Sequence, residues 1–231
     1  MYGRKEVMKV KKDVMILTGA GQIGMAIARR MGYGKKIVIG DKKLENAQKI
    51  AEIMNNAGFD AEAVEMDLSS RESIRNLIAR AMEYGDISML VNAAGVSPSQ
   101  ATAEELLQLD ILQLENIRDT LHAYQMAKRC NEKRVMAEAV KWGKRNARIN
   151  SISPGIIVTP LAVDELNGPR GDFYKNMFAN CPAGRPGTAD EVANAAELLM
   201  SDKGAFITGA DFLIDGGATA SYFYGPLKPE K

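Results

Sequence analysis

The chain has 231 residues, of which 46% are hydrophobic, so it is long enough to bury one sizeable core, and we expect a single domain over residues 1–231. Lysine and arginine total 30 against 29 acidic residues, which gives no electrostatic case for nucleic acid or an anionic membrane as a partner. The two cysteines, Cys130 and Cys181, and the single His122 do not suggest a disulfide framework or a metal site. The apolar run after the N-terminal lysines is too short for a signal sequence or a membrane span, so we expect a cytoplasmic protein.

The stretch from Val14 to Gly24, VMILTGAGQIG, combines a short apolar run with three glycines and the start of a helical pattern. It predicts a buried strand, a tight turn and the N-terminus of a first helix. Gly19, Gly21 and Gly24 have the spacing G-x-G-x-x-G, in which the missing side chains let backbone N–H groups approach a pyrophosphate. Such a loop alone is also compatible with a packing turn or with a methyltransferase, so the elements that follow must decide.

A second strand is predicted at residues 36–40, and Asp41 follows it. Asp41 lies 22 residues after Gly19, close to the spacing at which an acidic side chain meets the adenosine ribose hydroxyls of NAD. The next two residues, Lys42 and Lys43, are cations that could instead hold the 2′-phosphate of NADP. We therefore expect NAD as the cofactor, with NADP as the alternative.

The alternation of apolar strands and amphipathic helices continues to Gly95. Strands are predicted at residues 61–66 and 87–91, and Ser69 with Glu72 is predicted as a capping box for the helix between them. This order predicts a doubly wound parallel sheet between two layers of helices, an α/β/α Rossmann fold, with ligands at the carboxyl ends of the strands.

The second half of the chain continues the pattern less clearly. A helix is predicted at residues 123–144, strands at 148–152 and 211–214, and a capping box at Thr188 and Glu191. Residues 159–187 show no single period, and we interpret them as a mobile lid. The aromatic residues 222–224 are apolar enough to dock on a neighbouring subunit.

Tyr124 and Lys128 are four residues apart on a predicted helix, so their side chains share one face. A cation beside a phenol favours the phenolate and moves its pKa from about 10 toward neutrality, as a proton donor to a nascent alkoxide requires. An isolated pair of this kind is also common on ordinary helix surfaces.

Together these motifs resemble the short-chain dehydrogenase/reductase family, over essentially the whole chain and in family order. The matching residues are Thr18-Gly19 with the glycine loop, Asp67-Leu68, Asn92-Ala93-Ala94-Gly95, the pair Tyr124 and Lys128, Asn150 to Gly155 with Thr159-Pro160, and Thr208-Gly209 through Asp215-Gly216-Gly217. A methyltransferase explains only the glycine loop, so we rank it last.

The resemblance implies hydride transfer between a nicotinamide cofactor and a small-molecule ketone or secondary alcohol of the hydroxysteroid, sugar or polyol, or 3-oxoacyl class. It implies that Tyr124 is the general acid or base, that Lys128 holds the nicotinamide ribose, and that the protein forms a homo-oligomer, a tetramer or a dimer. The residues implied to line the cofactor cleft are Gly19, Gly21, Gln22, Ile23, Gly24, Asp41, Asp67, Leu68, Asn92, Ala93, Ala94, Gly95, Tyr124, Lys128, Pro154, Gly155, Ile157 and Thr159.

The chain departs from the family in three places. The glycine loop is one residue shorter than usual, and Asn92-Ala93-Ala94-Gly95 replaces Asn-Asn-Ala-Gly. Only 28 residues separate Gly95 from Tyr124, where the family has a helix, a central strand and the serine that orients the substrate carbonyl. Ile111 and Leu112 stand near that serine's place.

We therefore expect that a segment of about 30 to 40 residues, long enough for a helix and a strand, is missing from the printed sequence near 110/111 and carries the serine. A true deletion would remove a middle strand and leave the backbone groups of its neighbours unpaired. The alternative to an oxidoreductase is a catalytically inactive sensor or scaffold that kept the dinucleotide cleft and lost the serine.

Overall fold

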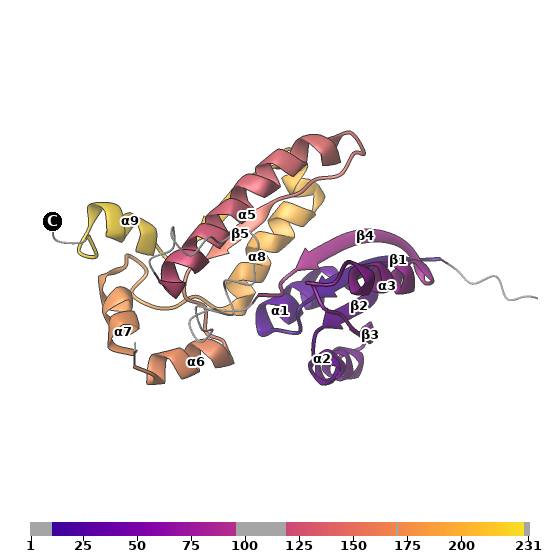
Figure 1. Ribbon diagram of the computed structural model, residues 1–231, viewed down its shortest axis with the longest axis horizontal. Coiled ribbons are helices and arrows are strands. Elements are labelled where there is room, and N and C mark those ends of the chain that lie inside the picture. Colours follow the sequence, from indigo (N-terminus) through magenta and orange to yellow (C-terminus); the bar gives the residue numbers. More distant parts are fainter. Residues whose placement is uncertain (1–10, 96–118, 170, 229–231) are drawn as a thin grey trace, which may run out of the picture. The chain divides into compact units, whose positions relative to one another are not determined.

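A computed structural model describes residues 11–95, 119–169 and 171–228 (Figure 1). The contacts between its Cα atoms divide the chain into two compact units, Met1–Ala94 and Gly95–Lys231, and each unit is described by itself. The expectation of one domain over the whole chain stays a prediction, and the junction at 110/111 lies outside the described residues.

The first unit is a parallel sheet flanked by helices. Its elements are β1 (Lys12–Thr18), α1 (Gln22–Met31), β2 (Lys36–Asp41), α2 (Leu44–Asn56), β3 (Asp60–Glu65), α3 (Arg71–Met82) and β4 (Gly85–Asn92). The strand order is β3-β2-β1-β4, and every neighbouring pair is parallel. The chain therefore runs outward from β1 to β3 and returns to the other side of β1, which places a topological switch point at the carboxyl ends of β1 and β4. This arrangement is the doubly wound fold that the sequence predicts.

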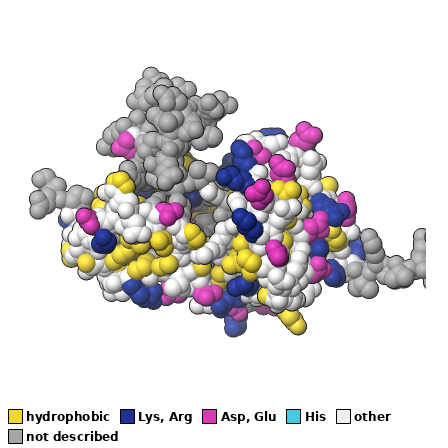
Figure 2. Space-filling view, turned by 90° about the horizontal axis from the view of Figure 1, so that it is seen from below, with side chains coloured by type: hydrophobic (Ala, Val, Ile, Leu, Met, Phe, Trp, Pro, Cys, Tyr) yellow, Lys and Arg dark blue, Asp and Glu magenta, His cyan; other side chains and the backbone are white. Residues whose placement is uncertain are grey.

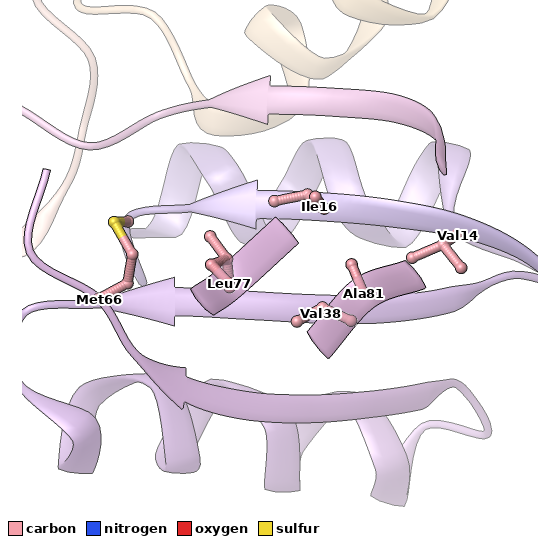
Figure 3. Packing of buried hydrophobic residues seen from close by; sticks show 6 residues of the cluster. All are labelled: Val14, Ile16, Val38, Met66, Leu77 and Ala81. Carbon is pink, nitrogen blue, oxygen red and sulfur yellow. The ribbon is translucent and has the colours of Figure 1, made fainter. Parts of the chain in front are cut away.

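The apolar runs of β1 and β2 form the centre of this unit, because a parallel strand between two helix layers buries both faces. On one face, Val14, Ile16 and Val38 pack beneath Leu77 and Ala81 of α3, as Figure 3 shows. The alternate residues of the same strands point to the opposite face.

On that opposite face, glycines of α1 allow the helix to approach the sheet closely. A Cβ atom at Gly24 would lie 2.9 Å from Leu17 Cδ1, and one at Gly32 would lie 2.5 Å from Ile37 Cδ1. The first helix and the third therefore cover the two faces of β1 and β2.

β4 differs from the strands beside it. Among the described residues it pairs with β1 alone, and Ile87 and Leu90 leave 37% and 51% of their surfaces exposed. Parallel sheets usually have both faces covered, so exposed apolar side chains on a parallel strand are uncommon. Among the described residues, β4 therefore carries exposed apolar side chains at one edge of the sheet.

The second unit contains a small parallel sheet and several helices (Figure 1). Its elements are α5 (Thr120–Gly143), β5 (Ser151–Pro154), α6 (Pro160–Asn167), α7 (Gly171–Asn180), α8 (Ala189–Met200), the 3₁₀ helix η3 (Asp202–Gly204), β6 (Asp211–Ile214) and α9 (Ala218–Tyr224). β5 pairs with β6 over four residues, and Val192, Ala196 and Leu199 are buried side chains of α8. Among the described residues, no helix is long and apolar enough to cross a membrane.

Arg148 links the end of α8 to the segment before β5. Its guanidinium donates hydrogen bonds to the carbonyl oxygens of Leu199, Ser201 and Gly204, the last two at 3.1 and 2.9 Å. The last carbonyls of a helix have no partner within it, so Arg148 satisfies acceptors that the fold would otherwise leave to water.

Three sequence expectations need correction. Ser70, rather than Ser69, caps α3 and accepts a hydrogen bond from the Ser73 N–H, because Asp67 binds both the N–H and the hydroxyl of Ser69. The strand predicted at residues 148–152 begins at Ser151. Residues 159–187, where the sequence showed no single period, contain the two helices α6 and α7, while their interpretation as a mobile lid stays a prediction.

Other elements match the prediction. The strand at residues 211–214 has the predicted bounds, and the capping box of Thr188 and Glu191 is present at the start of α8. The helix predicted at residues 123–144 is α5.

Leu77 tests the packing of α3 on the sheet. Leu77→Ala removes a side chain that is 2% exposed and leaves a cavity over β1 and β2, so we expect a loss of about 2–5 kcal/mol in the free energy of unfolding. Ile78→Ala is the matched control on the next residue of the same helix, which is 40% exposed, and should cost about 1 kcal/mol or less. Denaturant unfolding followed by circular dichroism measures both, and equal losses would contradict this packing.

Candidate active site

The three glycines of the first loop have three different structural roles. Gly19 adopts a φ of +89°, and a Cβ atom there would lie 2.5 Å from the backbone N and Cα of Ala94. Gly24 permits the close contact of α1 with Leu17. A Cβ atom at Gly21 would meet nothing within 4 Å. These are the turn, helix-packing and ligand-approach positions of a pyrophosphate-binding loop.

The N-terminus of α1 opens beside Gly21. The helix begins at Gln22, its first turn contains no acidic residue, and its first internal hydrogen bond runs from the Met25 N–H to the Gly21 carbonyl at 2.9 Å. The N–H groups of Gln22, Ile23 and Gly24 precede that bond, so they carry the positive end of the helix dipole. This geometry fits a pyrophosphate, even though the loop is one residue shorter than the family usually has.

Asp41 joins the end of β2 to the glycine loop. Its Oδ2 accepts a hydrogen bond from the Ala20 N–H at 2.9 Å, and its Oδ1 accepts one from the Lys43 N–H at 2.9 Å. Gly19 adds a 2.7 Å bond from its N–H to the Gly40 carbonyl. The carboxylate is therefore fixed beside the loop, where a dinucleotide fold holds the adenosine ribose.

The loop after β3 carries Asp67 and Leu68. Asp67 Oδ1 accepts hydrogen bonds from the Ser69 hydroxyl at 2.7 Å and the Ser69 N–H at 2.8 Å, and Lys42 Nζ lies 3.2 Å from Asp67 Oδ2. The hydrogen bonds from Ser69, together with the Lys42 ammonium, lower the pKa of Asp67 to about 2. Leu68 is 43% exposed, so an apolar side chain stands at the surface where a base could stack.

The end of β4 is bonded to the end of β1. The Thr18 hydroxyl donates to Asn92 Oδ1 at 2.6 Å, and the Ala93 N–H donates to the Thr18 carbonyl at 2.9 Å. Ala93 and Ala94 then pass directly over Gly19. The residues that the sequence assigns to the cofactor in this unit, from the glycine loop to Ala94, thus all lie at one edge of one sheet.

In the second unit, Tyr124 and Lys128 lie side by side on α5. Lys128 Nζ is 5.4 Å from the centroid of the Tyr124 ring, and it is 3.9 Å from the place of a Cβ atom on Gly95. Tyr124 is half-buried, and Lys128 is exposed. A cation at this distance interacts favourably with the ring and with negative charge on the phenol oxygen.

The residues after β5 have well-defined structural roles. Gly155 donates its N–H to the Ile214 carbonyl at 3.1 Å, and a Cβ atom there would lie 2.8 Å from Asp215 Cα. Ile157 is buried and pairs with Gly187, while the Thr159 hydroxyl accepts a hydrogen bond from Ala162 at the start of α6. Pro154 is therefore the last residue of β5, and Gly155, Ile157 and Thr159 lie in the short segment between β5 and α6.

Sequence reasoning missed two pairings at the edge of the first sheet. The contact of Asp41 with the Ala20 N–H and that of Lys42 with Asp67 both join loops that are distant in the chain. The ion pair of Lys42 and Asp67 could have been predicted, because the two opposite charges follow the ends of neighbouring parallel strands. The strand pattern alone does not give the direction of a side chain beyond the end of its strand.

The strand order, the glycine loop and Asp41 define a dinucleotide-binding Rossmann protein. Family models described as "short chain dehydrogenase" and "Enoyl-(Acyl carrier protein) reductase" match residues 13–117 and 105–219. The chain is 32% identical to D-threitol dehydrogenase of Mycolicibacterium smegmatis, over 89% of this chain and 92% of the relative. It is 28% identical to 7alpha-hydroxysteroid dehydrogenase of Bacteroides fragilis, over 91% of this chain and 96% of that relative.

The crystal structure of gox2181 superposes with a TM-score of 0.77 at 25% identity, over 92% of this chain and 97% of that one. The chain therefore belongs to the short-chain dehydrogenase/reductase family, whose members are oxidoreductases that bind nicotinamide dinucleotides. The resemblance that the motifs indicated is confirmed.

The relatives contain residues that this chain lacks. The alignment with D-threitol dehydrogenase has 246 positions, more than the 231 residues of the whole chain, although it uses only 89% of them. Several tens of positions in the relative thus have no counterpart here. The two family models meet at residues 105–117, which include the expected junction.

Substitutions at Gly19 and Gly21 test the folding of the loop and the approach of a ligand to it separately. Gly19→Ala should lower the midpoint of thermal unfolding or leave the protein insoluble, because the new Cβ would overlap the Ala94 backbone at a positive φ. Gly21→Ala should fold normally, because its Cβ has open space, yet should weaken NADH binding at least about tenfold by blocking close approach of the phosphates. Thermal unfolding and NADH fluorescence titration measure the two effects. Unchanged NADH affinity in a folded Gly21→Ala variant would exclude this loop as the pyrophosphate site.

Proposed function

We propose that the protein is an NAD(P)-dependent oxidoreductase that transfers a hydride between nicotinamide and a ketone or secondary alcohol. The observation that carries this proposal is the pair of Tyr124 and Lys128, with the ammonium 5.4 Å from the ring on one helix face. Relatives named as dehydrogenases of a polyol and of a hydroxysteroid support the same chemistry. The substrate is a hydroxysteroid, a sugar or polyol, or a 3-oxoacyl compound.

Tyr124 supplies the proton chemistry. In reduction its phenol donates a proton to the substrate oxygen as an alkoxide develops there, and in oxidation the phenolate removes the proton from the alcohol. The Lys128 ammonium stabilises the negative charge on the phenol oxygen and binds the nicotinamide ribose. A bound nicotinamide ring supplies the hydride acceptor or donor.

NAD is the preferred cofactor in this proposal. The Asp41 carboxylate, held by two backbone N–H groups, accepts hydrogen bonds from ribose hydroxyls and repels a 2′-phosphate. Gln22 and Ile23 belong to the pyrophosphate site, Asp67 and Leu68 to the adenine site, and Asn92 to Gly95 line the cleft. Pro154, Gly155, Ile157 and Thr159 surround the nicotinamide end.

We further propose that the complete domain has a middle strand beyond β4, in a segment that belongs near 110/111 and carries the catalytic serine. Two observations support this proposal: Ile87 and Leu90 are exposed on a strand that pairs with β1 alone among the described residues, and alignments with relatives are longer than the chain. With that strand in place, residues 1–231 would belong to a single domain.

We also propose a homo-oligomer, a tetramer or a dimer. Figure 2 shows hydrophobic side chains at the surface of the part of the molecule that carries α6, α7 and α9. Exposed apolar residues of these helices include Phe173 on α7 and Tyr222, Phe223 and Tyr224 on α9. Apolar surface of this kind marks sites of protein association.

A second candidate function is a dinucleotide-binding sensor or scaffold without turnover. The spacing of 28 residues between Gly95 and Tyr124 favours it, because Ile111 and Leu112 stand near the place of the family's serine. The adenosine end of the site needs no residue from that interval. Binding would then persist where catalysis is absent.

Tyr124→Phe tests the proton donor. The variant should bind NADH with unchanged affinity but lose at least about a hundredfold in kcat, because only the phenolic hydroxyl is removed. A library of secondary alcohols offered with NAD and NADP, followed by absorbance at 340 nm, supplies the substrate. Tyr33→Phe, at a residue that is 85% exposed, is the control and should leave kcat unchanged. Equal activity in the Tyr124→Phe variant would remove the acid role, and binding without turnover in the unsubstituted protein would favour the sensor.

Insertion of a family segment tests the missing strand. The residues of D-threitol dehydrogenase that align between positions 110 and 111 but have no counterpart in this chain are inserted there, and a Gly/Ser linker of the same length is the control. We expect the family segment to raise the midpoint of unfolding, reduce binding of a hydrophobic dye and increase kcat, because it covers the edge of β4. Light scattering on the same samples reports the oligomeric state. No gain over the linker in any of these properties would contradict the proposal.

A further inference from the structure

The ion pair between Lys42 and Asp67 joins two loops at the adenosine end of the site. Lys42 follows β2 and Asp67 follows β3, and these strands are parallel neighbours. Lys42 Nζ lies 3.2 Å from Asp67 Oδ2. Both residues belong to the first unit, so the pair does not depend on the rest of the chain.

Asp67 is the fixed member of this pair. Its other oxygen accepts two hydrogen bonds from Ser69, and its own N–H donates to the Ser73 hydroxyl at 2.9 Å. Its side chain is 37% exposed, whereas that of Lys42 is 77% exposed. A flexible lysine side chain is therefore drawn to an anchored carboxylate.

Lys42 is also the residue directly after Asp41, which holds the ribose position. A 2′-phosphate on that ribose needs a cation close to it, and Lys42 is the nearest residue in sequence that could supply one. In the structure its ammonium is directed instead toward the loop after β3.

We infer that Asp67 is a positioning residue for cofactor choice: it holds Lys42 away from the adenosine 2′ position and so raises the preference for a 2′-hydroxyl over a 2′-phosphate. This inference rests on the proposed function and adds a second contribution to that of Asp41. Because the pair is exposed, its effect is modest and weakens as salt screens it.

The inference can be tested with fragments that occupy the adenosine end alone. The probes are 5′-AMP and 2′,5′-ADP, titrated by calorimetry at low salt into the full chain. Asp67→Asn should tighten 2′,5′-ADP about two- to fivefold relative to 5′-AMP, because Lys42 becomes available to the 2′-phosphate. Glu52→Gln, an exposed acid on α2, is the control for the change in net charge and should leave the ratio unchanged.

A double-mutant cycle separates positioning from simple repulsion. If Asp67 acts through Lys42, Asp67→Asn in a Lys42→Ala background should no longer change the ratio. An equal change in both backgrounds would mean that Asp67 repels the phosphate directly and would overturn the inference, as would no change in either background. A Lys43→Ala variant that retains the Asp67→Asn effect would support Lys42 as the cation, and loss of the effect there would overturn that assignment. Failure of both probes and of NADH to bind the unsubstituted chain would reject the proposed function itself.

Discussion

The close approach of Gly19 to the backbone of Ala93 and Ala94 is the constraint on which the nucleotide site depends. At that point the first loop passes beneath the end of β4 with room for hydrogen atoms only. Hydrogen bonds hold the loop to the strands on either side of β1. The Thr18 hydroxyl donates to Asn92 Oδ1 at the end of β4, and the Gly19 N–H donates to the Gly40 carbonyl of β2. Three strand ends are thereby fixed relative to one another, and the N-terminus of α1 opens over the edge that they form. A bulkier residue at position 19 would displace the whole edge.

Asp41 belongs to the fold and to the site at once. Two backbone N–H groups donate to the Asp41 carboxylate and offset much of the free energy lost when its charge leaves water. Each oxygen keeps a further lone pair that can accept a hydrogen bond from a ribose hydroxyl. The residue that we propose as the ribose ligand thus also holds the loop that we propose as the phosphate site. Removing the charge of Asp41 would change the ribose contact and the loop shape together. Asp67 pairs with Lys42 and not with the glycine loop, so its substitution tests the effect of charge at the 2′ position with the loop left intact.

The sequence predicted correctly those elements that depend on interactions between residues a few positions apart. The buried runs of β1 and β2, the glycine turn after β1 and the capping box at Thr188 follow from spacing and side-chain chemistry within a few residues. The cap of α3 was wrong by one residue because Asp67 binds Ser69, and competition between two nearby acceptors is not visible in a pattern. Arg148 was missed because its carbonyl partners lie at the end of a helix about fifty residues later in the chain, and the pairing appears only after folding.

In the proposed function, nucleotide binding and turnover depend on different parts of this chain. The proposed pyrophosphate loop, Asp41 and the loop of Asp67 all lie within Met1–Ala94, on a sheet whose two central strands bury their apolar runs. The phenol and the ammonium lie on α5 in the second unit, after the interval of 28 residues between Gly95 and Tyr124 in which we propose the missing segment. A missing middle strand would expose the outer edge of β4 but would leave the β1 and β2 side of the cleft intact. Loss of catalysis with retained adenosine binding is therefore the specific consequence of a shortened chain, whereas damage to the glycine loop would remove both.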